Sequence, residues 1–330
     1  MENKRKKDKI RVGILRGGAG KHYESSLQKG GDIISHIFEN LSDKYKIVDI
    51  LIDKKGDWHI NGMPISPADL MRKIDVAWNT SQHPNLSITL DNLSIPSVEN
   101  GSFLGALENS SDMLKAHIKS IGVQMPRSIV LPLYQKDFSA QGGSASGGDG
   151  SINEYSIKKA KEILNKFPAP WIVRSYTPDS NEGIHLAKTF PELISAIEDV
   201  VAHEKSVLVE EFISGKIASV HSMPKFRGKD FYTFPLGNTF GNSLRLGEIG
   251  FSSLEKEKLI NLAKELHRHI GAKHYLKSDF VLHPQRGFFL TGVDFSPDLR
   301  KDSHFYQSCE FVGVKMHHVI EHILDRALIV

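Results

Sequence analysis

The residues best suited to chemistry are two aspartates on either side of the short stretch "HPQRG". The pattern "LKSDFVLHPQRGFFLTGVD" predicts a hairpin, and if its turn centres on the Gln–Arg step, Asp279 lies opposite Gly292. Asp294 then projects from the same face, because side chains alternate along a strand. Diagonal neighbours in a sheet are roughly 7–8 Å apart, and two carboxylates at that separation can share a divalent cation that bridges to nucleotide phosphates. Taken alone, such a pattern is more often two exposed acids.

A second pattern places a cation at the end of a strand. In "PWIVRSYTPDSNEG" an apolar run ends at Arg174, and small polar residues follow. A cation beside such a loop is one way to hold a phosphate, and a surface turn is the other interpretation. The stretch "VLVEEFISG" ends in Glu210 and Glu211, which could serve a purine or stand as solvated acids on an edge strand. The stretch "RGGAGK" lacks the GxxxxGK[ST] and GxGxxG spacings, so a plain tight turn explains it equally well.

The composition bounds the class of protein. A chain of 330 residues that is 40% hydrophobic and 25% charged is an ordinary globular protein of two or three domains. The net charge is only +3, and residues 1–9 read as a solvated basic tail, since no aromatic residues interleave with the cations. No apolar run suits a membrane span or a signal peptide, and one cysteine, Cys309, excludes a disulfide framework. We therefore expect a cytoplasmic protein without nucleic-acid or membrane partners.

The elements that position these residues fall into three parts. Residues 10–100 alternate strands with helices, which predicts an α/β domain with a parallel, Rossmann-like sheet. Residues 101–212 predict an α+β lobe whose first helix is capped by Ser111, with a Gly/Ser-rich loop at 138–154. Residues 213–330 predict a second α+β lobe.

Within these parts the periodicity predicts individual elements. Strands are expected at residues 73–79, 127–134, 171–173, 206–213, 230–236, 274–283 and 287–296. Helices are expected at residues 154–166, 191–203 and 316–327. A further helix begins at the Ser252–Glu255 capping box and ends at Gly271.

In this order the motifs resemble the ATP-grasp ligases, and among them the D-alanine–D-alanine ligase family. The resemblance is carried by "VGILRGGAGKHYESSL", "IPSVENGSFLGAL", "PWIVRSYTPDSNEG", "VLVEEFISG" and "LTGVDFSP", and it spans about residues 10 to 328. It implies an ATP-grasp fold, in which two α+β lobes clamp ATP beside an N-terminal α/β domain. It also implies ATP-dependent joining of two D-alanines through an acyl phosphate for peptidoglycan synthesis, with Mg²⁺ or Mn²⁺, by a protein that commonly forms homodimers.

The resemblance implies a role for each matching residue. The implied nucleotide-binding residues are Arg174, Gly183, Glu210, Glu211, Phe212 and Ile213. The implied catalytic residues are Glu24, Ser180, Arg245 and Lys277, of which Lys277 stands where the family has an arginine that steadies the tetrahedral intermediate. The implied metal ligands are Asp279 and Asp294.

Several positions depart from the family pattern. His22 replaces a carboxylate that engages the first D-alanine, Ser111 replaces a nucleotide-contacting lysine, and Ile217 replaces a ribose-binding glutamate. At the metal motif, Gly292-Val293-Asp294 replaces acid-x-Asn, so one carboxylate is lost and another gained two residues away. Three hypotheses follow: an active D-alanine–D-alanine ligase, a catalytically impaired or regulatory relative that binds nucleotide only, and a ligase for a different amino acid or peptide.

Overall fold

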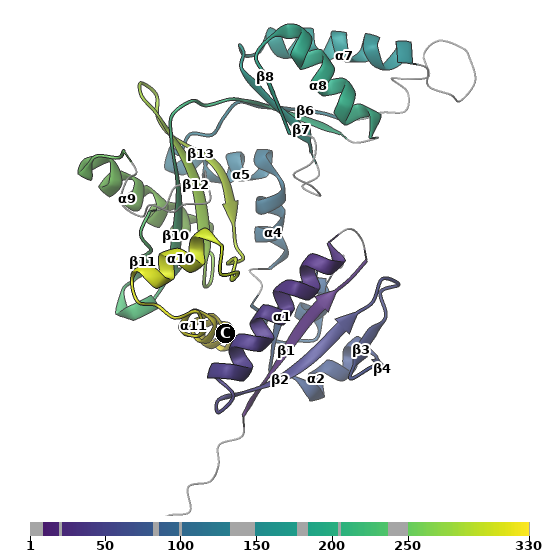
Figure 1. Ribbon diagram of the computed structural model, residues 1–330, viewed down its shortest axis with the longest axis vertical. Coiled ribbons are helices and arrows are strands. Elements are labelled where there is room, and N and C mark those ends of the chain that lie inside the picture. The colour runs from purple at the N-terminus through teal and green to yellow at the C-terminus, as the bar shows by residue number, and fades with distance from the viewer. Residues whose placement is uncertain are drawn as a thin grey trace, which may run out of the picture. The chain divides into compact units, whose positions relative to one another are not determined.

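The computed structural model describes residues 9–19, 22–81, 86–98, 101–132, 149–176, 184–203, 206–236 and 250–329 (Figure 1). The chain divides into two compact units. The first comprises Met1–Glu108, Ile217–Phe280 and Gly292–Val330, and the second comprises Asn109–Lys216 and Val281–Thr291. The three-part division at residues 100 and 212 stays a prediction.

The first unit begins with a five-stranded sheet in the order β4-β3-β2-β1-β5. Its strands are β1 (Ile10–Gly17), β2 (Tyr45–Ile52), β3 (Trp58–Ile60), β4 (Met63–Ile65) and β5 (Val76–Asn79). β1 pairs in parallel with β2 and with β5, which confirms the predicted parallel sheet. The continuous apolar runs of β1 and β2 suit a sheet that is covered on both faces. The third strand begins at Val76 rather than at residue 73, because Lys73 ends a short helix.

Helices complete this part of the first unit. They are α1 (Tyr23–Asn40), α2 (Leu70–Lys73), α3 (Leu86–Asn92) and α4 (Ser102–Asn109), with a 3₁₀ turn at Pro67–Asp69. α1 lies along β1 in Figure 1 and packs against α11 (Met316–Leu328). The predicted periodicity of α11 is confirmed, because Val319, Ile320 and Ile323 are fully buried in one core with Ile37 of α1.

A second sheet has the order β11-β10-β12-β13. Its strands are β10 (Lys216–Pro224), β11 (Phe231–Thr233), β12 (Leu276–His283) and β13 (Gly287–Asp294), with the helices α9 (Ser253–Ile270) and α10 (His304–Phe311) and a 3₁₀ turn at Phe226–Gly228. The capping box at Ser252 and Glu255 is present, and Gly271 ends α9 in the left-handed conformation, as predicted. β11 is shorter than the predicted strand at 230–236. β10 was not predicted, because its buried side chains include Ser219, His221 and Ser222 rather than an apolar alternation.

The second unit holds an antiparallel sheet in the order β6-β9-β7-β8. Its strands are β6 (Ser128–Leu131), β7 (Trp171–Ser175), β8 (His185–Ala187) and β9 (Val207–Glu211), and its helices are α5 (Ser111–Ile118), α7 (Asp149–Leu164) and α8 (Phe190–Ala202), with a 3₁₀ turn at Lys119–Ile121. Trp171, Val173 and Val209 form the centre of its core with Ile163 and Ile197. These burials confirm the predicted strands at 171–173 and 206–213.

Two local predictions in the second unit are wrong. The residue that caps α5 is Ser110, not Ser111, because the Ser110 hydroxyl accepts the Met113 N–H at 3.3 Å. α7 begins at Asp149, inside the predicted loop at 138–154. Once the amphipathic part of a helix has nucleated, each added residue contributes a further backbone hydrogen bond, so a helix can extend into a stretch of poor helix formers.

Two simpler expectations also concern the described residues. Cys309 is a free cysteine whose side chain is buried in the core of the first unit. Among the helices that the structure describes, none has the length and apolar character to span a bilayer.

Candidate functional site

The centre of the candidate site in the first unit is an ion pair on β12. Lys277 and Asp279 are two residues apart and share a face, whereas Ser278 and Phe280 between and beyond them are buried. The Lys277 ammonium lies 3.0 Å from an Asp279 carboxylate oxygen. The hydroxyl of Ser219, on the neighbouring strand β10, donates to the same carboxylate. Asp279 is therefore held from two sides.

The charge on Lys277 is stabilised by several acids at once. Burial opposes the charge, but the carboxylates of Asp279, Asp294 and Asp298 outweigh it and raise the pKa of Lys277. Asp279 and Asp294 also act on each other, since Asp279 is among the groups that raise the pKa of Asp294. The structure thus brings the two predicted metal ligands, one from β12 and one from β13, into electrostatic range of a single ammonium group.

Asp294 has a second carboxyl neighbour that the sequence did not indicate. Glu108, near the end of α4, hydrogen-bonds the Asp294 side chain. Glu108 is exposed as a whole residue, but its carboxyl group is surrounded by protein atoms. This loss of solvation, together with the charge of Asp294, raises the pKa of Glu108 to about 8. Loss of solvation also raises the pKa of Asp294, against the Ser296 N–H that it accepts at 2.8 Å. Lys29 of α1 is the cation whose charge reaches both acids.

The oxygen donors here suit a hard divalent cation. The described residues contain no preformed group of three or more His, Cys, Asp or Glu side chains for a metal. Magnesium, however, is usually bound through one or two carboxylates together with substrate phosphates. Gly292, where the resemblance implies an acid, leaves room, since no atom beyond its chain neighbours lies within 4 Å of a Cβ built there. The two aspartates therefore fit Mg²⁺ or Mn²⁺ if a nucleotide supplies further oxygens.

A buried chain of aromatic groups borders this acid cluster. His221 of β10 has one ring nitrogen 2.7 Å from the Tyr275 hydroxyl and the other 2.6 Å from a nitrogen of His304, at the start of α10. Burial lowers the pKa of His221 far below its usual value and that of His304 to about 4, so both rings are neutral at neutral pH. The remaining nitrogen of His304 is buried without a hydrogen-bond partner among the described residues. No local pattern in the sequence indicated that these three side chains hydrogen-bond one another.

The backbone at Gly17 and Gly18, where β1 ends, is fixed by packing. Gly17 and Gly18 have φ angles of 91° and 102°, and the Gly17 N–H donates to the Ser26 hydroxyl at 2.8 Å. A Cβ at Gly17 would lie 2.2 Å from the Ile52 carbonyl oxygen. Glu24, one of the implied catalytic residues, is exposed in the first turn of α1. The "RGG" letters are thus explained by a tight turn.

The predicted nucleotide residues in the second unit form two ion-paired groups. Arg174 of β7 contacts the Glu210 carboxylate of β9 through its Nε at 3.1 Å. Glu211 points to the other face, where Arg127 lies 2.9 Å and Arg286 lies 2.6 Å from its oxygens. Burial works against the charge of Glu211, but these guanidinium groups outweigh it and lower its pKa to about 2. The Glu211 carboxylate is therefore committed to holding the sheet together.

The two residues after β9 also have contacts within the second unit. The Phe212 N–H donates to the Pro170 carbonyl at 3.0 Å, and the Ile213 side chain is buried. The implied roles of Ser180, Gly183 and Arg245 fall outside the described residues. The roles of Arg174, Glu210, Glu211, Phe212 and Ile213 toward a nucleotide stay predictions.

Comparison with known proteins defines first the fold and then the family. A solved structure titled VanG D-Ala:D-Ser ligase from Enterococcus faecalis matches 97% of this chain and 100% of its own, with a TM-score of 0.74 and 16% identity. A D-alanine–D-alanine ligase from Bacillus anthracis, complexed with ATP, matches 97% of both chains with a TM-score of 0.69 and 18% identity. The fold is therefore that of the ATP-grasp ligases.

The sequence comparisons narrow the class to a family. A curated D-alanine–D-alanine ligase from Christiangramia forsetii is 21% identical over 97% of this chain and 99% of its own length. The profile of the family described as D-ala D-ala ligase C-terminus matches residues 149–325, which is more than half of the chain. The chain belongs to the D-alanine–D-alanine ligase family.

Proposed function

We propose that this protein is an ATP-dependent carboxylate–amine ligase that joins two molecules of D-alanine through an acyl phosphate, for peptidoglycan precursor synthesis. The observation that carries the proposal is the Lys277–Asp279 pair with Asp294 in range, at the positions where the family holds its catalytic cation and its metal ligands. The family match and the ATP-bound relative support ATP as the phosphoryl donor.

Lys277 supplies positive charge where negative charge develops. Its raised pKa keeps the ammonium protonated at neutral pH, and the contact with Asp279 at 3.0 Å fixes its position. A fixed, half-buried cation stabilises the oxyanion formed when the amine of the second substrate attacks the acyl phosphate. Lysine keeps the charge of the family's arginine but not its planar fork, so the contact with the oxyanion is through one point charge.

Asp279 and Asp294 are the residues that would hold Mg²⁺ or Mn²⁺. When bound, the cation neutralises charge on the transferring phosphoryl group. The positive charge of Lys277 offsets part of the repulsion between these two half-buried carboxylates. In the second unit, Arg174 is the residue proposed to meet the phosphates, which requires its Glu210 partner to share the guanidinium with an anion.

The test is phosphate release from MgATP with and without D-alanine. The proposal expects release that depends on both, a thermal shift with MgATP, and loss of both metal dependence and turnover in Asp279→Asn. Asp91→Asn, an exposed aspartate on α3, is the matched control and should behave as wild type. No turnover and no shift with MgATP would overturn the proposal.

Two alternatives are separated by the same assay. A nucleotide-binding relative without catalysis is favoured by Gly292 and by the Glu108–Asp294 hydrogen bond, which ties up one predicted ligand. It expects a thermal shift with MgATP but no phosphate release with any amino acid. A ligase for a different amino acid or peptide is favoured by His22, and it expects release with another amino acid in a screen but none with D-alanine.

The proposal extends to compartment and assembly. An ATP-dependent ligase with one buried free cysteine suits the reducing, ATP-rich cytoplasm. A homodimer is proposed from the family resemblance. Light scattering coupled to gel filtration tests it, with a mass of twice 36.9 kDa expected.

A further inference from the structure

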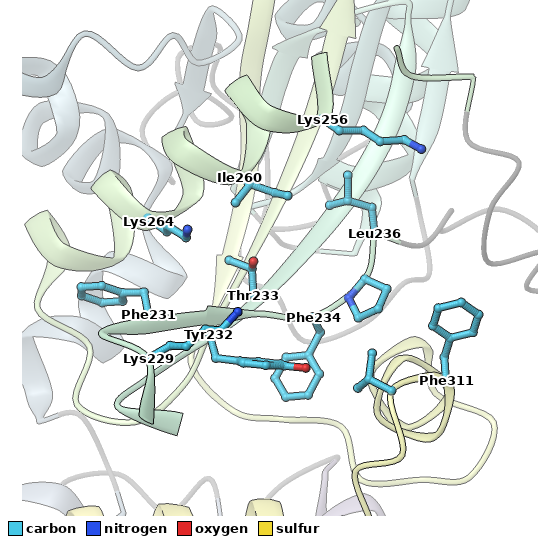
Figure 2. Close-up of a pocket in the computed structure, with 12 residues that line it drawn as sticks. Lys229, Phe231, Tyr232, Thr233, Phe234, Leu236, Lys256, Ile260, Lys264 and Phe311 are labelled. Carbon is cyan, nitrogen blue, oxygen red and sulfur yellow. The ribbon is translucent and has the colours of Figure 1, made fainter. Parts of the chain in front are cut away.

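A pocket of about 420 Å³ lies in the first unit, and none of its lining residues is one of the acids or lysines of the candidate site (Figure 2). It is bounded by β11 and the residues after it, by α9, and by the end of α10. The apolar part of the lining comes mainly from Phe231, Tyr232, Phe234, Leu236, Ile260 and Phe311. Its volume falls within the range of roughly 300–1,000 Å³ that holds small organic ligands.

The aromatic wall of the pocket is preformed. Tyr232 and Phe234 meet edge to face with their ring centroids 4.9 Å apart, and both rings also pack against Phe226. On the other side Phe311 exposes 62% of its surface and adds a further apolar ring to the lining. Rings held in this way offer an apolar surface that needs little rearrangement to receive a ligand.

Three lysines give the pocket a single sign of charge. Lys229, Lys256 and Lys264 are among the lining residues, and none of the lining residues that the structure describes is an aspartate or a glutamate. Lys256, Ile260 and Lys264 follow one another at intervals of four residues, which places them along one face of α9. Within the described part of the chain none of the three lysines forms an ion pair, and the Lys229 ammonium lies 5.9 Å from the centre of the Tyr232 ring.

From this combination we propose that the pocket binds a small organic anion, namely a carboxylate on an aromatic or aliphatic body. The body would contact the aromatic wall, and the carboxylate would meet the ammonium group of either Lys256 or Lys264, which lie two turns apart on α9. Charge complementarity favours an organic anion as the ligand. The three lysines would repel a cation, and a neutral apolar compound would make no charge interaction with them. The proposal is independent of the ligase activity.

The test compares two fluorescent probes that differ in charge. 8-Anilinonaphthalene-1-sulfonate is an anion with an apolar body, and N-phenyl-1-naphthylamine carries the same rings without the charge. With the full chain we expect saturable 1:1 binding of the anion, about tenfold weaker binding of the neutral probe, and displacement of the anion by 2-naphthoate but not by 2-naphthamide. Equal affinity for both probes would contradict the proposal.

Matched variants on one helix locate the site. The double variant Lys256→Ala/Lys264→Ala should weaken anion binding about tenfold without changing the neutral probe. Lys258→Ala, on an exposed position of the same helix, is the control and should bind as wild type. Unchanged melting temperatures separate lost binding from lost folding. If the double variant binds as Lys258→Ala does, or if MgATP displaces the probe, the assignment to this pocket is wrong, whatever the phosphate-release assay shows.

Discussion

Two arginines hold the Glu211 carboxylate, and we predict that this residue anchors the second unit, which Glu211→Gln tests. The residue is 8% exposed, and Arg127 and Arg286 contact it at 2.9 Å and 2.6 Å. The difference between the ordinary value of 4.5 and a pKa of about 2 corresponds to about 3 kcal/mol of stabilisation at neutral pH. Since the two arginine side chains are 47% and 42% exposed, solvent screens part of this, and we expect a loss of about 2 kcal/mol.

The assay is urea unfolding of both proteins between pH 7 and pH 3. A carboxyl group whose pKa is lowered by folding stabilises the protein above its unfolded value of 4.5, and this contribution disappears as the pH falls toward 2. The difference between wild type and Glu211→Gln should therefore be largest at pH 7 and shrink below pH 4.5. Glu162→Gln, which removes an exposed pair with Lys159, is the control and should cost less than about 0.5 kcal/mol. If Glu211→Gln is as mild as this control at pH 7, the anchor is refuted.

Three further predictions address the first unit. Lys277→Met should lower kcat by about 100-fold or more, while Lys277→Arg should retain most of the activity. Steady-state kinetics test this, with Lys73→Met at an exposed position as the control. A wild-type kcat for Lys277→Met would contradict the prediction. Burial lowers the pKa of His267 to about 4 and that of His274 to about 3, so below pH 6.5 the unfolded chain binds more protons than the folded protein. As the pH falls from 6.5 to 5, the free energy of unfolding should therefore decrease by about 1.4 kcal/mol per pH unit for each histidine. A urea midpoint that does not change between pH 6.5 and 5 would contradict this. Gly17→Ala should cost about 2–4 kcal/mol because its Cβ would meet the Ile52 carbonyl, whereas Gly31→Ala, with open space in α1, should not destabilise; equal melting temperatures of the two variants would refute the packing argument.

Features that depend on near neighbours in the chain were predictable. The parallel pairing of β1 with β2 and β5 follows from apolar runs separated by a helix, and the cap at Ser252 follows from a four-residue pattern. The family resemblance likewise identified Lys277, Asp279 and Asp294 as a group before any geometry was known. The structure brings these side chains into one electrostatic cluster.

Features that depend on distant partners could not be predicted. β10 carries Ser219 and His221 in its interior, and such residues are tolerated only because Asp279, Tyr275 and His304 satisfy them. The ion pairs of Glu211 left no local sign in the sequence, because its partner Arg286 lies 75 residues further along the chain. No local pattern pairs Glu108 with an aspartate on β13, since burial and long-range hydrogen bonds leave no periodic signal.

The most direct test of the proposed ligase reaction follows an oxygen atom. With D-alanine labelled with ¹⁸O in its carboxylate, a carboxylate oxygen attacks the γ-phosphorus of ATP and ADP leaves, so the acyl phosphate carries the label in its bridging position. Attack by the second amine then breaks the acyl carbon–oxygen bond and releases that oxygen with phosphate. Mass spectrometry of the products should find one ¹⁸O in each phosphate and one in each dipeptide amide bond. Phosphate without the label, released by water from ATP, would contradict the account.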